Sequence, residues 1–344
     1  MTLTNTNFKT VLITGGAGFI GNNFIRLFLE RHKGVEVVNL DKLTYAGNLE
    51  SLRDIESNPS YHFYKGDIAD DAFVRRLFNE WHFDAVVNFA AESHVDRSIL
   101  GPSAFIDTNV RGTMTLLEVA REFGVGRFLQ VSTDEVYGSL GATGKFTELT
   151  HIAPNSPYSA SKASSDFLVR AWWKTFDLPT LTTRCSNNYG PYQFPEKFIP
   201  LMIANAMQDK NLPIYGDGMN VRDWIYVDDH CDAIDAVLYN GKIGEIYNIG
   251  GGNEIPNIEM AKLILSKLGK PETLLEYVKD RPGHDRRYAM DSSKIEKELG
   301  WKPAKAFSEG IELTVKWYLD NEKWWKRIIS GEYQDYYKLQ YGGR

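Results

Sequence analysis

A short apolar run that ends in three evenly spaced glycines stands near the start of the chain and limits its possible folds. The run Val11–Thr14 leads directly into a loop with glycines at Gly15, Gly18 and Gly21. Such a loop turns sharply out of a strand, and its glycines let the backbone approach a pyrophosphate and let the next helix pack closely. The helix N-terminus adds unpaired N–H groups and a partial positive charge. The GxxGxxG spacing therefore predicts a dinucleotide-binding strand–turn–helix unit.

An acidic residue follows at the distance that this unit needs. Asp41 ends the next apolar run, 20 residues beyond Gly21, where a ribose-binding acid is expected. Asp41 would repel a 2′-phosphate and so favours NAD, although the adjacent Lys42 weakens that preference. Asp67, at the end of a third run, is placed to reach the adenine. A glycine-rich turn in an unrelated α/β protein is the alternative at this point.

Apolar runs and amphipathic stretches alternate along the first half of the chain, which indicates a parallel, doubly wound sheet. The expected strands are Thr10–Thr14, Val35–Leu40, His62–Lys65, Ala85–Phe89, Arg127–Ser132, Leu181–Arg184 and Ile246–Ile249. The expected helices are Gly21–Arg31, Asp71–Glu80, Pro102–Phe123, Tyr158–Phe176, Ile199–Gln208, Ile258–Leu268, Asp291–Leu299 and Phe307–Trp325. We expect a Rossmann-type α/β fold with a smaller mixed α/β lobe. Residues 1–185 with 222–250 would form the NAD-binding domain, and 186–221 with 251–344 the substrate lobe.

Charge and cysteine usage argue against several classes of protein. The 344 residues carry a formal net charge of −6 with both signs interspersed, so no basic stripe suggests a nucleic-acid partner. No run approaches the ~20 apolar residues that span a bilayer, and the first nine residues lack an apolar signal core. Cys185 and Cys231 have no disulfide or metal-ligand spacing and are expected to be packed thiols. His94 and His284 suggest no metal site either. We expect a cytoplasmic protein without a membrane partner or a metal.

Tyr158 and Lys162 form a YxxxK motif on an expected helix, where residues four apart share one face. Lys162 could lower the pKa of the Tyr158 phenol, helped by a positive nicotinamide ring. An ionised tyrosine can take a proton from a sugar hydroxyl as hydride leaves the same carbon. Thr133, 25 residues upstream at a strand end, could bond the substrate oxygen. The motif is common by chance, but beside the glycine loop it predicts a dehydrogenase-type site.

These motifs together resemble the extended short-chain dehydrogenases that act on nucleotide sugars. Residues 131–138, with the pair Asp134 and Glu135, are similar to the catalytic segment of the dTDP-glucose 4,6-dehydratases. Epimerases of this fold usually lack the pair, and decarboxylases typically keep only the Glu. The resemblance continues through residues 90–98, 186–192 and 280–285. It implies an NAD-dependent hydro-lyase that turns dTDP-glucose into its 4-keto-6-deoxy form for deoxysugar biosynthesis, for example of rhamnose.

The Asp-Glu pair also has a chemical reason. Once C4 of the sugar is a ketone, a carboxylate can remove the acidified C5 proton while a carboxylic acid assists loss of the C6 hydroxyl. Two nearby carboxyl groups can hold different protonation states when their environments differ. The resemblance makes Glu135 the base and Asp134 the acid. Because adjacent side chains of a straight strand point to opposite faces, we expect the backbone to leave extended geometry near Asp134.

The resemblance also implies the binding residues. For NAD they are Gly15, Gly18, Phe19, Ile20, Gly21, Asp41, Lys42, Leu43, Thr44, Asp67, Ile68, Phe89, Ala90, Ala91, Ser93, Thr108, Tyr158, Lys162 and Asn188. For the nucleotide sugar they are Ser93, Thr133, Asn187, Lys197, Phe198, Pro213, Ile214, Tyr215, Arg222, Asn257, Asp280, Arg281, Pro282, Gly283 and His284. Guanidinium groups suit a diphosphate, although composition alone would place these loop arginines at the surface.

Two long helices carry apolar and aromatic residues beyond one face, among them Trp172 and Trp173. The resemblance implies that residues 102–123 and 158–176 pair with a second copy in a four-helix bundle, giving a homodimer; packing on the sheet is the alternative.

Other functions stay open: the same chemistry on another nucleotide-glucose, an epimerase or decarboxylase, or a non-catalytic NAD-sensing protein. The intact acid pair and YxxxK motif argue against the last three. One methyl group separates thymine from uracil, a difference of only ~1–3 kcal/mol in a packing site.

Overall fold

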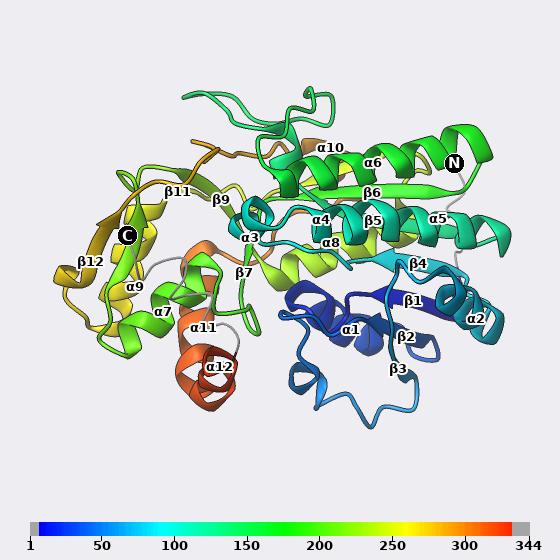
Figure 1. The fold of residues 1–344 in the computed structure, drawn as a ribbon, viewed down its shortest axis with the longest axis horizontal. Helices are drawn as coiled ribbons and strands as arrows, with labels where there is room; N and C mark the ends of the chain where they lie inside the picture. The colour runs from blue at the N-terminus through cyan, green and yellow to red at the C-terminus, as the bar shows by residue number, and fades with distance from the viewer. Residues whose placement is uncertain (1–6, 332–344) are drawn as a thin grey trace.

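A computed structural model describes residues 7–331 of the chain and contains a seven-stranded parallel sheet (Figure 1). The strand order is β10-β6-β5-β4-β1-β2-β3, which confirms the expected Rossmann-type doubly wound fold. The strands are β1 (Thr10–Thr14), β2 (Glu36–Asp41), β3 (Tyr61–Lys65), β4 (Ala85–Asn88), β5 (Arg127–Thr133), β6 (Thr180–Cys185) and β10 (Ile246–Ile249). The direction of winding reverses between β1 and β4, and the crevice at such a reversal is where ligands of these sheets bind.

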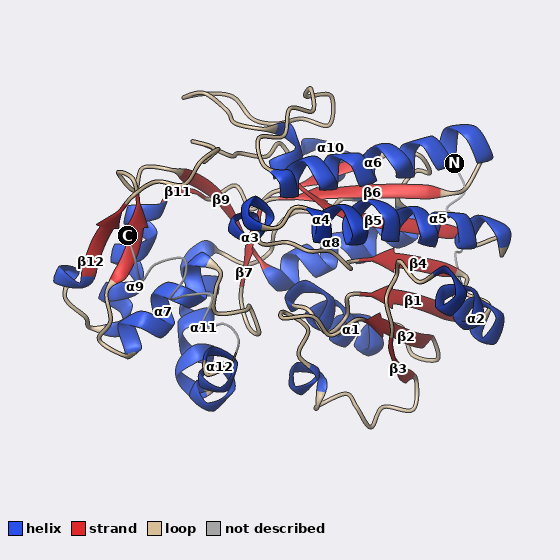
Figure 2. Cartoon of the chain, in the orientation of Figure 1, coloured by secondary structure: helices blue, strands red, loops and turns tan. Residues whose placement is uncertain are grey.

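Helices cover both faces of this sheet (Figure 2). One face carries α1 (Phe19–Arg31), α8 (Val227–Asn240) and α10 (Ser293–Leu299), and the other carries α2 (Asp71–Trp81), α5 (Thr113–Glu122) and α6 (Pro157–Phe176). In β1, Val11 and Ile13 pack into the core under α1 and α8, while Leu12 packs into the core under α2 and α5. Strand β1 is therefore buried on both sides, which explains the apolar run at its centre.

A second hydrophobic core holds the smaller lobe together. Its helices are α7 (Phe198–Met207), α9 (Asn257–Leu268), α11 (Phe307–Asp320) and α12 (Glu322–Ile329). Its strands form the sheets β11-β9-β7 and β12-β8, from β7 (Asn187–Tyr189), β8 (Leu212–Tyr215), β9 (Val221–Tyr226), β11 (Glu254–Pro256) and β12 (Leu275–Val278). Trp224 and Tyr226 of β9 enter this core, whereas Ile225 and Val227 enter the core of the large sheet. One strand therefore joins the two lobes through its alternating side chains.

Two expected helices differ from the sequence prediction. The segment Pro102–Phe123 is not uniformly α-helical: α4 (Ser103–Phe105) continues into a π-helical stretch, Ile106–Gly112, before α5. Asn109 within this stretch accepts a hydrogen bond from the Glu92 amide (2.9 Å) and donates one to Ser161 Oγ (2.8 Å). These tertiary contacts have no periodic signature in the sequence.

The expected helix Phe307–Trp325 is also wrong as one element, because α11 ends before Asn321 and α12 begins after it. The bend lets the Trp325 indole donate to the Tyr318 carbonyl (2.9 Å) and become fully buried in the core of the smaller lobe. The five strands β7, β8, β9, β11 and β12 were not expected. β7 and β11 have three residues each, which is too short for alternation to be recognised.

The domain boundaries stay a prediction, and one observation bears against their C-terminal range. Ile295 and Trp301 pack in the core of the large sheet rather than in the smaller lobe. Residues 1–6 and 332–344 of the expected ranges lie outside the described residues.

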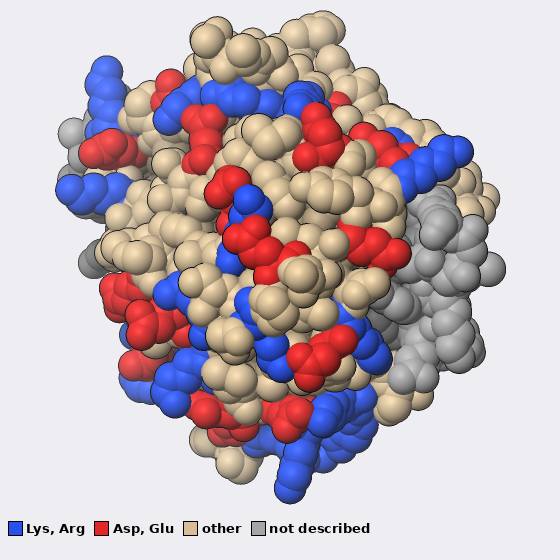
Figure 3. Space-filling view, turned by 90° about the vertical axis from the view of Figure 1, so that its left-hand side faces the viewer, with Lys and Arg blue, Asp and Glu red and all other residues tan. Residues whose placement is uncertain are grey.

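Within residues 7–331, no helix combines the length and apolarity needed to cross a membrane. The face of the smaller lobe seen in Figure 3 carries basic and acidic side chains interspersed.

Candidate active site

A cavity of about 290 Å³ opens where the carboxyl ends of the strands in the large sheet meet, at the reversal between β1 and β4. It combines the residues expected at NAD with the residues expected to be catalytic. The expected residues that line it are Gly15, Gly18, Phe19, Ile20, Gly21, Asp41, Lys42, Thr44, Asp67, Ile68, Phe89, Ala90, Ala91, Ser93, Thr108, Thr133, Asp134, Glu135, Tyr158, Lys162, Asn187, Asn188 and Lys197. The fold thus brings residues between positions 15 and 197 to one cleft.

The glycine loop has the geometry that a pyrophosphate requires. Gly15 adopts φ +70°, and a Cβ atom on it would lie 2.6 Å from the backbone nitrogen of Ala90. Helix α1 begins at Phe19, and its N-cap residue Gly18 offers no side chain to satisfy the first amides. Gly18, Phe19, Ile20 and Gly21 line the cleft, so the partial positive charge of this helix N-terminus lies at the cavity. The residues present therefore fit the diphosphate of NAD.

Asp41 and Lys42 have separate partners. The Asp41 carboxylate accepts hydrogen bonds from the amides of Ala17 (2.9 Å) and Leu43 (2.7 Å). Burial raises the pKa of this carboxyl group, and the two hydrogen bonds oppose the rise. Lys42 Nζ lies 2.7 Å from Asp67 Oδ2. The lysine charge is therefore already paired, which removes the main reason to expect a 2′-phosphate here. Leu43 does not line the cavity and packs against the core of the large sheet instead.

The backbone leaves extended geometry directly after β5, as expected. Residues Asp134–Tyr137 form a 3₁₀ turn, and Thr133 caps it by accepting a hydrogen bond from the Glu135 amide (3.3 Å). Both carboxyl groups therefore line the cleft. Thr133 Oγ1 donates to Asp134 Oδ1 (3.1 Å), whereas Asp134 Oδ2 is buried without a hydrogen-bond partner among the described residues. A buried, unpaired carboxyl oxygen at a cleft is available to a ligand hydroxyl.

The two carboxyl groups meet different electrostatic surroundings. Burial raises the pKa of Asp134 well above its usual value, and the neighbouring charges of Glu135 and Asp223 add to the effect. Burial also raises the pKa of Glu135, but three cations oppose it: Arg281, Lys197 and Arg222. Asp134 is thus the group that keeps its proton, and Glu135 is the group that ionises first. This order matches the expected acid and base.

Tyr158 and Lys162 are buried and line the cleft from the first turns of α6. Lys162 Nζ donates to the Val131 carbonyl (2.8 Å). The pKa of Tyr158 is raised well above its usual value, because the phenol is buried and Glu135 lies near it; a hydrogen bond with Thr133 acts in the opposite direction. A lower pKa of Tyr158, caused by Lys162 together with the nicotinamide ring, stays a prediction.

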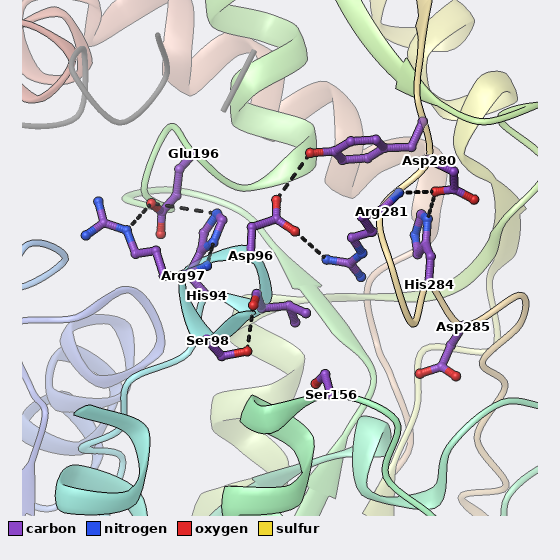
Figure 4. A network of polar contacts seen from close by, with 12 residues as sticks. His94, Asp96, Arg97, Ser98, Ser156, Glu196, Asp280, Arg281, His284 and Asp285 are labelled. Atoms are coloured by element: carbon purple, nitrogen blue, oxygen red, sulfur yellow. Dashed lines mark hydrogen bonds and ion pairs between the residues drawn. The ribbon is translucent and has the colours of Figure 1, made fainter. Parts of the chain in front are cut away.

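Composition alone would place the arginines expected at the substrate on the surface, but the structure does not expose them. Arg222 is buried, donates to the carbonyls of Val221 (2.9 Å) and Asp285 (3.0 Å), and lies over the ring of Tyr288. Arg281 pairs with Asp96 at 3.3 Å, as Figure 4 shows. The charges of both guanidinium groups act on Glu135 and oppose the rise of its pKa.

The other residues expected at the nucleotide sugar lie outside the cavity lining, on the smaller lobe. Phe198 and Asn257 open α7 and α9, and Pro213, Ile214 and Tyr215 belong to β8. Ile214 is buried in the core of that lobe, so its side chain is structural. The segment 280–284 forms a loop in which His284 Nδ1 lies 2.6 Å from Asp280 Oδ1 (Figure 4). This loop holds Arg281, Pro282 and Gly283.

Sequence reasoning missed several residues that line the cleft. They are Leu40, Ala46, Gly47, Gly66, Glu92, Val131, Ser132, Cys185, Ser186, Gln193, Phe194 and Glu196. Glu196 stands out because its side chain is only 1% exposed, and burial raises its pKa to about 7 against the charges of Lys197 and Arg97. Perturbed acids cluster at functional sites. Its only signal in the sequence was its position next to Lys197.

Within the described part of the chain, no group of three or more His, Cys, Asp or Glu side chains could hold a metal ion. Cys185 and Cys231 are both buried, and each is a free thiol. Burial raises the pKa of the Cys185 thiol, which also lies near Asp134. The cleft therefore presents carboxyl, phenol and amine groups as its reactive side chains.

Known proteins are similar to this chain in sequence and in fold. The chain matches the family described as GDP-mannose 4,6 dehydratase over residues 12–314. The dTDP-glucose 4,6-dehydratase of Xanthomonas campestris pv. campestris is 58% identical, over 94% of this chain and 97% of that protein. A dTDP-glucose 4,6-dehydratase structure from Streptomyces venezuelae, with NAD bound, is 50% identical with a TM-score of 0.91, over 93% of this chain and 99% of that one. A UDP-glucose 4-epimerase from Thermotoga maritima is 30% identical with a TM-score of 0.85, over 91% and 99%. The chain therefore belongs to the GDP-mannose 4,6 dehydratase family of nucleotide-sugar enzymes.

Proposed function

We propose that this chain is an NAD-dependent 4,6-dehydratase of dTDP-glucose. The observation that carries the proposal is the pair Asp134 and Glu135, which line the cleft side by side: the pKa of both carboxyl groups is raised, that of Asp134 strongly, while three cations oppose the rise at Glu135. The fold alone is shared with an epimerase, so it does not separate the two activities. The dehydratases at 50–58% identity support the choice of reaction and of nucleotide sugar.

The first half of the reaction falls to Tyr158 and Thr133. Thr133 orients the C4 hydroxyl of the sugar, and Tyr158 accepts its proton. NAD supplies the reversible hydride acceptor, which takes hydride from C4 and returns it to C6. Because burial raises the pKa of Tyr158, its ionisation requires a positive charge beside it. The oxidised nicotinamide ring and Lys162 are the two charges to which we assign this effect.

The dehydration falls to the acid pair. Glu135, held near Arg281, Lys197 and Arg222, removes the C5 proton once C4 is a ketone. Asp134 keeps its own proton and gives it to the departing C6 hydroxyl, so that water leaves across C5 and C6. Glu135 then returns a proton to C5. The cycle has no net redox change, and its product is a 4-keto-6-deoxy sugar nucleotide.

Incubation with dTDP-glucose in deuterated water tests this function. We expect a 4-keto-6-deoxy product that carries deuterium at C5, formed without added NADH, because the C5 proton exchanges with solvent while hydride is recycled internally. NMR of the sugar reads both features. Unchanged substrate, or a product that retains its C6 oxygen, would rule out a dehydratase. A C4 epimer would point instead to an epimerase.

The nucleoside preference follows from a parallel assay. The dTDP-, UDP-, CDP- and GDP-linked glucoses, compared by kcat/KM, rank the four bases in one experiment. We expect dTDP-glucose to be the best substrate. The segment Pro213–Tyr215 of β8, with Lys197 and Phe198, is where we place the nucleoside end of the substrate, and Asn257, Arg222 and the loop 280–284 would hold its diphosphate and sugar.

We further propose that the chain works as a homodimer in the cytoplasm. Exposed apolar side chains on the helices before and within the α4–α5 segment and on α6 support a second copy as partner. Leu100, Ile106 and Phe167 are 61%, 51% and 55% exposed. Two α4–α5 segments and two α6 helices would then form the four-helix interface. The two unpaired cysteines suit a reducing compartment.

A further inference from the structure

Asp96 occupies a short helix of the NAD-binding lobe but makes its contacts with the other lobe. Helix α3 (Val95–Leu100) holds the carboxylate nearly buried, at 5% exposure. Asp96 Oδ1 accepts a hydrogen bond from Arg281 Nη1 (3.3 Å), and Asp96 Oδ2 accepts one from the Tyr215 hydroxyl (3.2 Å). Figure 4 shows the Asp96 carboxylate joined to the Arg281 guanidinium group. Three segments that lie far apart in the sequence thus meet at one acid.

Arg281 keeps donors free for a further ligand. Asp96 engages only one terminal nitrogen, and Arg281 Nε is buried without a hydrogen-bond partner among residues 7–331. A guanidinium group has five N–H donors in a planar fork that suits phosphate oxygens. The Arg281 side chain is 17% exposed, so it still reaches solvent on one side. A nucleoside diphosphate would satisfy the donors that the protein leaves open.

Asp96 also decides which acid Arg281 faces. The charge of Arg281 acts on Glu135, and Arg222 lies close enough for the two arginines to repel each other. After Asp96, the carboxyl group whose charge acts most on Arg281 is Glu135, the acid that we assign as the base. Asp96 therefore offers the arginine a partner outside the reacting centre.

The surrounding segment makes the same kind of contact. Lys197 Nζ donates to the Ser93 carbonyl (2.8 Å), and His94 and Arg97 lie 3.8 and 3.6 Å from Glu196. Residues 93–97 are therefore where the NAD-binding lobe meets the residues before and at the start of α7. Within this segment, Asp96 contacts Tyr215 of β8 and Arg281 of the loop 280–284.

From this geometry we propose that Asp96 is a positioning residue, which orients Arg281 and Tyr215 to receive the nucleoside diphosphate end of the substrate. The proposal rests on the proposed function for the identity of the ligand. It assigns Asp96 no contact with the reacting carbons, and Asp96 does not line the catalytic cavity. Its loss should therefore weaken nucleotide binding and leave the chemical steps unchanged.

The substitution Asp96→Asn tests this role, because it keeps the shape and removes the charge. Calorimetric titration of the NAD-loaded protein with dTDP, which has no sugar to react, should show about tenfold weaker binding, as expected for loss of a charged hydrogen-bond partner. Steady-state assays should show a similar rise in KM for dTDP-glucose with kcat within about twofold of wild type. A residue that only supported the fold would lower kcat and NAD content together.

Asp217→Asn is the matched control, since Asp217 forms an exposed ion pair with Arg286 on the same lobe. It should leave dTDP affinity and KM unchanged. Unchanged dTDP affinity in Asp96→Asn would overturn the role of Asp96, even if the enzyme turns over dTDP-glucose as proposed. Failure of the wild-type protein to turn over dTDP-glucose would instead count against the proposed function, and dTDP binding would still report on Asp96.

A double-mutant cycle covers the case in which Asp96→Asn does not fold. Arg281→Lys and Tyr215→Phe each disturb one partner of Asp96 and keep the carboxylate. If both partners are held by one acid, their penalties on dTDP binding should be non-additive. Additive penalties would overturn the proposal, because they would mean that Arg281 and Tyr215 are oriented independently.

Discussion

Asp134 and Glu135 are neighbours in the sequence, yet the 3₁₀ turn gives their carboxyl groups different surroundings. Asp134 Oδ1 accepts from Thr133, and Oδ2 has no partner within the described part of the chain. Glu135 faces three cations that come from the smaller lobe. Which of the two carboxyl groups acts as the acid and which as the base therefore depends on residues more than 60 positions further along the chain. No local motif contains these residues.

The substitution Asp134→Asn separates the two halves of the reaction. Asparagine keeps the volume and cannot donate the acidic proton, so loss of water should slow while the first hydride transfer continues. We expect kcat to fall about 100-fold or more, the range of general acid catalysis. In a single turnover with dTDP-glucose, absorbance of NADH should rise and persist. If the NAD-loaded variant shows no NADH signal, Asp134 acts before dehydration and its assigned role is wrong.

At the scale of elements, one buried ion pair connects the catalytic helix to its neighbouring strand. Arg184 of β6 and Asp166 of α6 lie 2.9 Å apart with side chains 4% and 3% exposed. Arg184 also donates to the Tyr137 hydroxyl (2.9 Å), at the end of the turn that holds Asp134 and Glu135. This pair therefore links α6, with Tyr158 and Lys162, to the catalytic turn.

Removing one member of this pair should be strongly destabilising. Arg184→Met leaves the Asp166 carboxylate buried without its partner, so the free energy of unfolding should fall by about 3–5 kcal/mol. Arg286→Met, which breaks the exposed pair with Asp217, should change it by less than about 1 kcal/mol. Chemical denaturation of both variants measures the difference. Equal losses would show that burial does not govern the Arg184 pair.

At the scale of the whole molecule, the helical layer over one face of the sheet exposes several large apolar side chains. Helices α4, α5 and α6 lie side by side over this face (Figure 1). The exposed side chains are Leu100 of α3, Ile106 of the π-helical stretch and Phe167 of α6. Large exposed apolar patches mark association surfaces. The same helix α6 carries Tyr158, so association would also restrain the catalytic helix.

Phe167→Glu should therefore convert the proposed dimer into monomers. A charge in the centre of an apolar helix interface would be buried without a partner, which opposes association. Sedimentation velocity at micromolar concentration measures the oligomeric state. Tyr277→Glu is the matched control, because Tyr277 is 60% exposed on β12, away from these helices, and should leave the state unchanged. A monomeric wild-type protein would contradict the proposal.

The parts of the fold that could be predicted are those with a strong local pattern. Strands such as β1 and β4 are buried on both faces, so most of their residues are apolar and the apolar run can be recognised in the sequence. The short strands of the smaller lobe owe their pairing to distant segments, as with β12 beside β8. The π-helical stretch and the bend at Asn321 likewise follow from tertiary hydrogen bonds of Asn109 and Trp325.

The sequence by itself determined the doubly wound sheet, the glycine loop, the YxxxK helix and the adjacent acids, because each is set by local spacing and backbone conformation. Only the tertiary structure decided which charges surround those groups. It paired Lys42 with Asp67, buried Tyr158 so that its pKa rises, and brought Arg281 and Arg222 to Glu135. The reason is physical: a pKa depends on burial and on charges within a few ångströms, and these come from residues that are neighbours in space but not in sequence.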